Sequence, residues 1–143
     1  PVSVKALYYQ QDLQDWARFH SIVINNPPIF PVNSVKAMRG CFVAIESGCI
    51  SRYAGLVFKD YWTNLEHISS DEVLSEIVEE SNMNAREFFG KISSDEYKQR
   101  LRSNTDELIE RGGFGSPTIY INGDDIYFGN DRLPLVERKL RGG

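Results

Sequence analysis

The stretch GGFGSPTIYINGDDIYFGNDRLP, residues 112–134, contains the signals that decide the fold. A glycine-rich turn leads into Ser116-Pro117, and two short apolar runs then flank Asn122-Gly123-Asp124-Asp125. Asn-Gly between apolar runs is the strongest short-range signal for a β-hairpin, so the stretch predicts strands at 118–122 and 126–128 with a turn between them.

Helical patterns fill most of the remaining sequence. Apolar residues recur at helical spacing, acidic residues or short capping side chains precede the segments, and glycines often end them. The expected helices cover residues 3–19, the segment from Asn33 or Ser34 to Gly48, then 50–62, 70–80, 84–92 and 94–111, and finally about 133–140.

This organisation leaves one hairpin among about six or seven helices, and a two-stranded hairpin is marginally stable in water. Either the helices cover the hairpin, or further strands lie outside this chain. The chain begins with Pro1 instead of methionine, which leaves open that the natural protein is longer and fits the second alternative.

Composition restricts the class of protein. The chain has 143 residues and a net charge of −4, which gives no basic footprint for nucleic acid or for an anionic membrane. No apolar run reaches the length of a membrane span and no signal peptide is visible, so we expect a cytoplasmic protein. Cys41 and Cys49 lack C-x-x-C or metal-ligand spacing, and His20 and His67 are isolated. We expect Cys41 to be a buried small residue. We expect no metal site.

Four segments together resemble a known family. They are Gly112-Gly113-Phe114-Gly115-Ser116-Pro117-Thr118, Phe128-Gly129-Asn130-Asp131-Arg132-Leu133, Lys5-x-x-Tyr8-x-x-x-Asp12-Leu13-x-x-Trp16 and Phe30-Pro31-Val32-Asn33-Ser34-x-x-Ala37-Met38-Arg39. The pattern resembles the 2-hydroxychromene-2-carboxylate isomerases and the kappa-class glutathione transferases, within the thioredoxin-like, DsbA-type superfamily. The compact spacing between residues 27 and 39 is more similar to the isomerase branch.

The resemblance implies an α/β fold, in which a thioredoxin-like domain carries a helical insertion. Residues 1–93 would form the insertion and residues 94–143 the C-terminal part of the thioredoxin-like domain. Members of the family begin with a strand and a helix that carry a Ser-Pro-Tyr type motif. No counterpart precedes Lys5, so no catalytic residue is assigned here, and this chain alone is expected to be inactive.

The resemblance also implies a glutathione site made of Lys5, Ser116, Pro117, Asn130 and Asp131. A cis proline without an N–H lets a thiol ligand approach, and Ser116 offers backbone groups to the cysteinyl part of glutathione. Asn130 and Asp131 would receive the γ-glutamyl group at a helix start, and Lys5 the glycyl carboxylate.

Each of these residues has a plain structural alternative. Pro117 can be a trans proline that opens an edge strand, Asp131 a helix cap, and Lys5 a solvated helix residue. Tyr61 and Trp62 are most simply core or interface residues, although they can also line a pocket for an aromatic substrate.

The function that the resemblance implies is glutathione-dependent cis–trans isomerisation of a small unsaturated aromatic keto acid, by reversible thiol addition in a homodimeric protein. The alternatives are a kappa-like glutathione transferase and a scaffold without catalysis. A DsbA-type disulfide exchanger would need C-x-x-C in a preceding segment, and Phe128–Leu133 argues against it.

Overall fold

The structure is a computed structural model that describes residues 4–123 and 125–142, and it divides into two compact units between Lys98 and Gln99. We call residues up to Lys98 the helical unit and residues from Gln99 the hairpin unit. Helix α6, Asp95–Glu110, begins in the first and ends in the second. The assignment of residues 1–93 to an insertion stays a prediction, because compactness alone does not assign a segment to a domain.

The helical unit contains the helices that the apolar spacing predicts. They are α1 (Val4–Phe19), α2 (Val35–Glu46), α3 (Ile50–Phe58), a π-helix (Lys59–Asn64), α4 (Asp71–Glu80) and α5 (Ala85–Ser93).

The predicted helix 50–62 differs from the structure in its last part. The α-helix ends at Phe58 and continues as a π-helix, whose carbonyl groups bond to the loop before α2. The backbone N–H of Asn25 donates to the carbonyl of Trp62 at 2.8 Å, and its side-chain Nδ2 donates to the carbonyl of Thr63 at 2.7 Å. The wider π turn therefore accompanies a long-range connection that local spacing does not encode.

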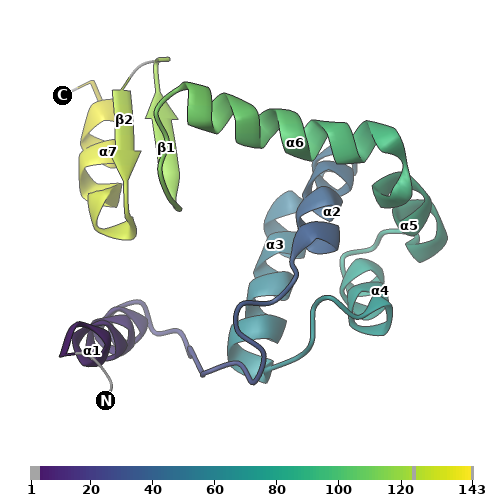
Figure 1. Cartoon of the computed structure of the whole chain (residues 1–143), viewed down its shortest axis with the longest axis horizontal. Coiled ribbons are helices and arrows are strands. Elements are labelled where there is room, and N and C mark those ends of the chain that lie inside the picture. Colours follow the sequence, from purple (N-terminus) through teal and green to yellow (C-terminus); the bar gives the residue numbers. More distant parts are fainter. Residues whose placement is uncertain (1–3, 124, 143) are drawn as a thin grey trace. The chain divides into compact units, whose positions relative to one another are not determined.

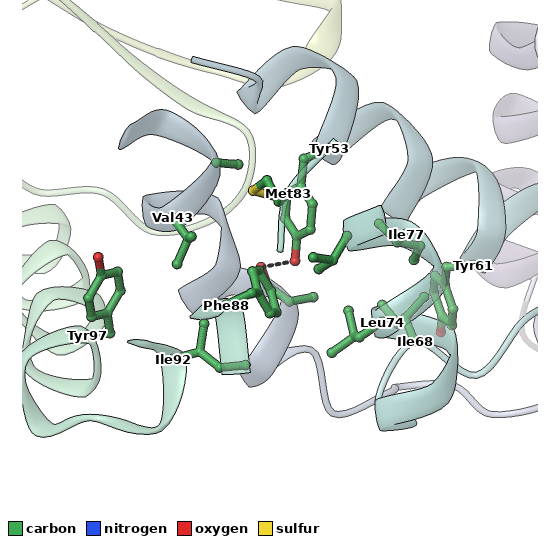
Figure 2. Packing of buried hydrophobic residues seen from close by; sticks show 13 residues of the cluster. Val43, Tyr53, Tyr61, Ile68, Leu74, Ile77, Met83, Phe88, Ile92 and Tyr97 are labelled. Atoms are coloured by element: carbon green, nitrogen blue, oxygen red, sulfur yellow. Dashed lines mark hydrogen bonds between the residues drawn. The ribbon is translucent and has the colours of Figure 1, made fainter. Parts of the chain in front are cut away.

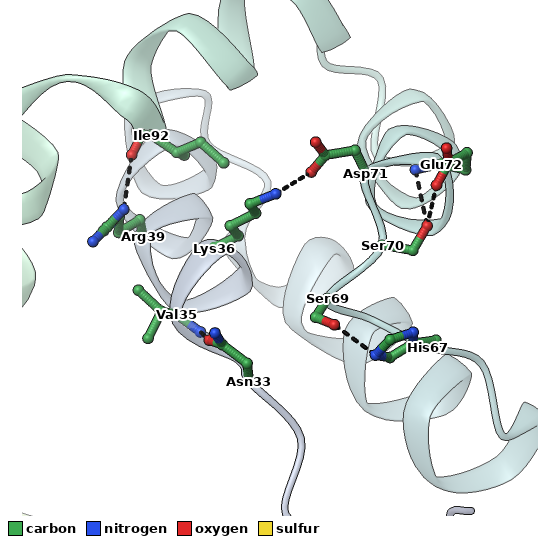
Figure 3. A network of polar contacts seen from close by, with 10 residues as sticks. All are labelled: Asn33, Val35, Lys36, Arg39, His67, Ser69, Ser70, Asp71, Glu72 and Ile92. Carbon is green, nitrogen blue, oxygen red and sulfur yellow. Dashed lines mark hydrogen bonds and ion pairs between the residues drawn. The ribbon is translucent and has the colours of Figure 1, made fainter. Parts of the chain in front are cut away.

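Capping side chains set where the helices begin. Asn33 Oδ1 accepts from the N–H of Val35 at 3.1 Å, and Ser70 Oγ accepts from the N–H of Glu72 at 3.2 Å (Figure 3). Asn84 Oδ1 accepts from the N–H of Glu87 at 2.9 Å at the start of α5. Each cap satisfies an N–H that has no partner within its helix. Of the two residues predicted to cap α2, Ser34 occupies the N-cap position without a side-chain cap hydrogen bond, and Asn33, one residue before it, supplies the side-chain oxygen.

The core of the helical unit lies between α2, α3, α4 and α5 (Figure 2). Tyr53 and Phe88 are fully buried, with ring centroids 5.8 Å apart. The Tyr53 hydroxyl donates to the carbonyl of Ala37 at 3.1 Å, so the one polar atom of that ring is satisfied in the core. Burial raises the pKa of Tyr53, which keeps the hydroxyl neutral.

The hairpin unit confirms the predicted hairpin. Strands β1 (Thr118–Ile121) and β2 (Asp125–Phe128) are antiparallel, with Thr118 opposite Phe128 and Ile121 opposite Asp125. Asn122 and Gly123 both have positive φ, as expected for this turn, whereas Asp124 of the predicted turn lies outside the described residues. Strand β1 ends one residue earlier than predicted, and strand β2 begins one residue earlier than predicted.

The last helix, α7 (Leu133–Leu140), follows a 3-10 helix at Asn130–Arg132 and lies beside the hairpin in Figure 1. Lys139 Nζ pairs with Asp125 Oδ2 at 2.9 Å, which connects α7 to β2. Pro134 stands in the first turn of α7, where the missing N–H is tolerated.

The C-terminal end of α6 is joined to the hairpin by Arg111. Its guanidinium carbon lies 3.7 Å from the ring centroid of Tyr120, and Nη2 donates to the carbonyl of Gly123 at 2.6 Å. Nη1 pairs with Glu107 at 2.8 Å, so the planar cation is held on three sides. This contact, together with α7, supplies part of the cover that an isolated hairpin lacks.

Candidate functional site

The predicted proline turn is present at the start of β1. The Ser116-Pro117 peptide bond is cis, as predicted, and both residues are exposed. The N–H of Gly129 donates to the carbonyl of Pro117 at 3.1 Å. This bond holds the segment that leads to Asn130 and Asp131 against the proline turn, so four of the five predicted ligand residues belong to one locality of the hairpin unit.

The carboxylate of Asp131 lies over the backbone of Gly129. The φ angle of Gly129 is 105°, and a β-carbon at this position would lie 2.6 Å from Asp131 Oδ1. The other oxygen, Oδ2, pairs with Arg132 Nη1 at 2.5 Å, and both side chains are 48% exposed. Neither the 3-10 helix nor α7 has a side-chain cap hydrogen bond, so the structure does not support the alternative in which Asp131 acts as a cap.

Lys5 is not among the residues that these contacts bring together. It belongs to the helical unit, where it is exposed on α1 and its ammonium group lies 5.6 Å from the ring centroid of Tyr9. Its predicted role at the glycyl carboxylate stays a prediction.

The helical unit contains an apolar cavity of about 280 Å³. The lining residues come from the loop before α2, from α2 itself, and from α3 with its π-helical continuation; they include Phe30, Met38, Cys41, Val57, Tyr61 and Trp62. Both Tyr61 and Trp62 line this cavity, as the alternative interpretation of the pair had it, while Tyr61 is also part of the core, as the simpler interpretation had it. A role of the pair toward an aromatic substrate stays a prediction.

Sequence reasoning missed the other walls of this cavity. Phe30 precedes a second cis peptide bond, Phe30-Pro31, and Met38 lies on α2. The proline after Phe30 was a visible signal of a special turn, but nothing local showed that this turn adjoins Trp62, whose ring centroid lies 6.1 Å from that of Phe30.

Cys41 corrects one expectation. It is half-buried instead of fully buried, because the cavity opens beside it. Its Sγ donates to the carbonyl of Ala37 at 3.6 Å, and burial raises the pKa of the thiol. Cys41 and Cys49 are both free thiols.

Two features are absent from residues 4–123 and 125–142. No cluster of three or more His, Cys, Asp or Glu side chains suited to a metal ion occurs there. Within the same residues, no helix combines the length and apolar character that a membrane crossing requires.

A cis proline at the start of a hairpin and a terminal helix beside that hairpin are features of the thioredoxin-like class of α/β proteins. A family profile described as "DSBA-like thioredoxin domain" matches residues 2–141. The chain belongs to this family.

Two similar proteins and one similar solved structure share the same name. Proteins named 2-hydroxychromene-2-carboxylate isomerase from Pseudomonas sp. (strain C18) and Pseudomonas putida are 30% and 34% identical, and each alignment covers 97% of this chain. A solved structure of 2-hydroxychromene-2-carboxylate isomerase matches with a TM-score of 0.85 and 28% identity over 96% of this chain. The chain spans 64% and 67% of the two relatives and 66% of the solved chain.

Proposed function

We propose that the protein is a glutathione-dependent cis–trans isomerase that acts on an unsaturated aromatic keto acid, in the manner that the name of its relatives suggests. The similarity to proteins named as isomerases supports the reaction class, since it extends over nearly the whole chain. The hydrogen bond from Gly129 to the carbonyl of Pro117 carries the proposal for this chain, because it joins the two halves of the predicted ligand site.

The residues of the hairpin unit fit a tripeptide thiol. Ser116 and Pro117 are exposed, and Pro117 presents no N–H that would have to be desolvated as a ligand approaches. The backbone of Ser116 would pair with the cysteinyl part of glutathione as an added strand does. When bound, glutathione would supply a thiol that adds reversibly to the conjugated carbon, so that the former double bond can rotate before the thiol leaves.

The segment after β2 would orient the other end of the ligand. The carboxylate of Asp131 is half-exposed and would accept a charge-assisted bond from the γ-glutamyl ammonium group. The γ-glutamyl carboxylate would be held by Asn130 and by the free backbone N–H groups at the start of the final helical segment. Fixing the ligand in this way lowers the entropic part of the barrier to reaction.

Replacing Asp131 by asparagine is expected to weaken glutathione binding about tenfold, because a charge-assisted bond is replaced by a neutral one. Calorimetric titration of the chain, and of the protein as it is expressed in its source, measures the affinity. Asp106→Asn on the exposed side of α6 is the matched control, since it removes the same charge away from the site, and it should bind glutathione like the unchanged protein.

The reaction itself is tested by following 2-hydroxychromene-2-carboxylate with and without glutathione. Isomerisation that requires glutathione supports the proposal. Glutathione binding without isomerisation by the source protein would favour a transferase or a scaffold, and absence of binding in both forms would exclude the glutathione site.

A further inference from the structure

We propose that a second apolar hollow of the helical unit, which we call the lysine groove, binds the alkyl chain of a free single-chain aliphatic carboxylate. The ionised group of that ligand would pair with Lys59 at the edge of the groove. The groove has a volume of about 590 Å³. It is lined by residues 22–24 on one side and by Gly55, Phe58, Lys59, Trp62 and Thr63 on the other. This inference goes beyond the proposed function and does not depend on it.

The shape of the lysine groove follows from its helical wall. Gly55, Lys59 and Thr63 recur every four residues along α3 and its π-helical continuation, so they share one helix face. At the rise of 1.5 Å per residue of a helix, this face extends over roughly 10 Å. The groove is therefore elongated along the helix, and a straight alkyl chain matches it better than a compact molecule.

Hydrogen bonds hold the two walls of the lysine groove together. The Thr63 hydroxyl donates to the carbonyl of Val23 at 2.7 Å, and the N–H of Asn25 donates to the carbonyl of Trp62 at 2.8 Å. The segment after α1 is thereby fixed against the π-helix without a ligand. A wall that is already ordered lowers the entropic cost of binding.

The lysine groove exposes more apolar surface than a chance neighbour would require. Ile22, Val23 and Phe58 are 54%, 58% and 64% exposed, and all three line it. An alkyl chain laid along these side chains removes their surface and its own from water, which is the main driving force for apolar association. Contiguous exposed apolar surface of this kind is typical of interaction sites.

Lys59 determines the charge of the ligand. It is the one charged side chain among the described residues that line the groove, and it forms no ion pair or side-chain hydrogen bond with residues 4–123 and 125–142. The neighbouring carboxylate of Asp60 accepts from Asn64 Nδ2 at 2.7 Å instead. An unpaired ammonium group beside an apolar groove complements a carboxylate whose chain lies in the groove. In the plain alternative the alkyl stem of Lys59 only covers apolar surface, and no anion is preferred.

The experiment uses the whole chain with Trp16→Phe, which leaves Trp62 as the single tryptophan. The probes are decanoate and decanol, each kept below the concentration at which it aggregates. Both should change the fluorescence of Trp62 saturably, and calorimetry gives their affinities. Lys59→Gln should weaken decanoate binding about fivefold and leave decanol binding unchanged, because only the carboxylate loses an ionic partner.

Two helical glycines offer a matched pair of variants. Gly55 lines the lysine groove, whereas Gly90 on α5 does not, and a β-carbon at either position meets nothing within 4 Å. Gly55→Leu should occupy the groove and weaken the binding of both probes about tenfold, since a filled volume admits no second chain. Gly90→Leu should leave binding within about twofold, because distant sites act independently. Circular dichroism confirms that both variants are folded.

Three outcomes would overturn the inference. They are absence of heat and of a fluorescence change with decanoate, an equal effect of Lys59→Gln on both probes, and unchanged decanoate binding in Gly55→Leu.

Two further results would assign the binding elsewhere and contradict the inference. Loss of decanoate binding in Ala54→Leu but not in Gly55→Leu would place the chain in the apolar cavity, which Ala54 lines. A dimer in sedimentation that Gly55→Leu dissociates would assign the lysine groove to a second copy of the chain.

Discussion

Replacing Phe88 by alanine is expected to lower the free energy of unfolding of the helical unit by about 3–5 kcal/mol. Phe88 is fully buried where α5 meets α2 and α3, and its ring lies against Tyr53 (Figure 2). The same ring meets Phe89 edge to face. Truncation removes the burial of a large apolar surface and leaves a cavity that close-packed neighbours fill only in part. Urea denaturation followed by circular dichroism measures the change.

Phe114→Ala is the control for this experiment. Phe114 is 75% exposed in the hairpin unit, so its truncation should change the free energy of unfolding by less than about 1 kcal/mol. A loss below 1 kcal/mol for Phe88→Ala would show that the α2–α5 contact does not hold the unit together.

Replacing Gly40 by alanine is expected to destabilise the helical unit by about 2 kcal/mol, even though alanine is the better helix former. A β-carbon at position 40 would lie 2.3 Å from the Tyr53 hydroxyl and 2.5 Å from Phe88 Cζ. Both rings are buried and cannot move freely, and displacement of Tyr53 would weaken its bond to the carbonyl of Ala37. Thermal and urea unfolding both measure the loss.

Gly90→Ala in α5 separates this steric effect from helix propensity. A β-carbon at Gly90 meets nothing within 4 Å, so the change should stabilise the protein by up to about 1 kcal/mol. If both substitutions stabilise, the close approach at Gly40 does not exist in solution.

The hairpin was predictable because its determinants are local. Asn122-Gly123 specifies a turn with positive φ, and the apolar runs on both sides set the register. The helices were predictable for the same reason, since Ser70 and Asn84 cap the segments that follow them. Boundaries moved by only one or two residues, except where the π-helix begins after Phe58.

The cavity was not predictable from spacing. Its walls combine a loop around Phe30 with helical residues such as Met38 and Trp62, and only tertiary packing brings them together. Tyr61 and Trp62 were recognisable as pocket candidates, but Phe30 and Met38, which complete the cavity, lie far from them in sequence. The glutathione residues came from the resemblance to a family. Local chemistry alone favoured Asp131 as a helix cap, but neither the 3-10 helix nor α7 has a side-chain cap hydrogen bond.

The close approach of Asp131 to Gly129 links two positions that a reader of sequences would treat separately. Any bulkier residue at 129 would push the acid aside while leaving the acid itself in the alignment. Natural variants that keep Asp131 but lose Gly129 should therefore not be assumed to have the same site. A comparison of related sequences should therefore ask whether Gly129 and Asp131 are present together, because the two positions form the site jointly.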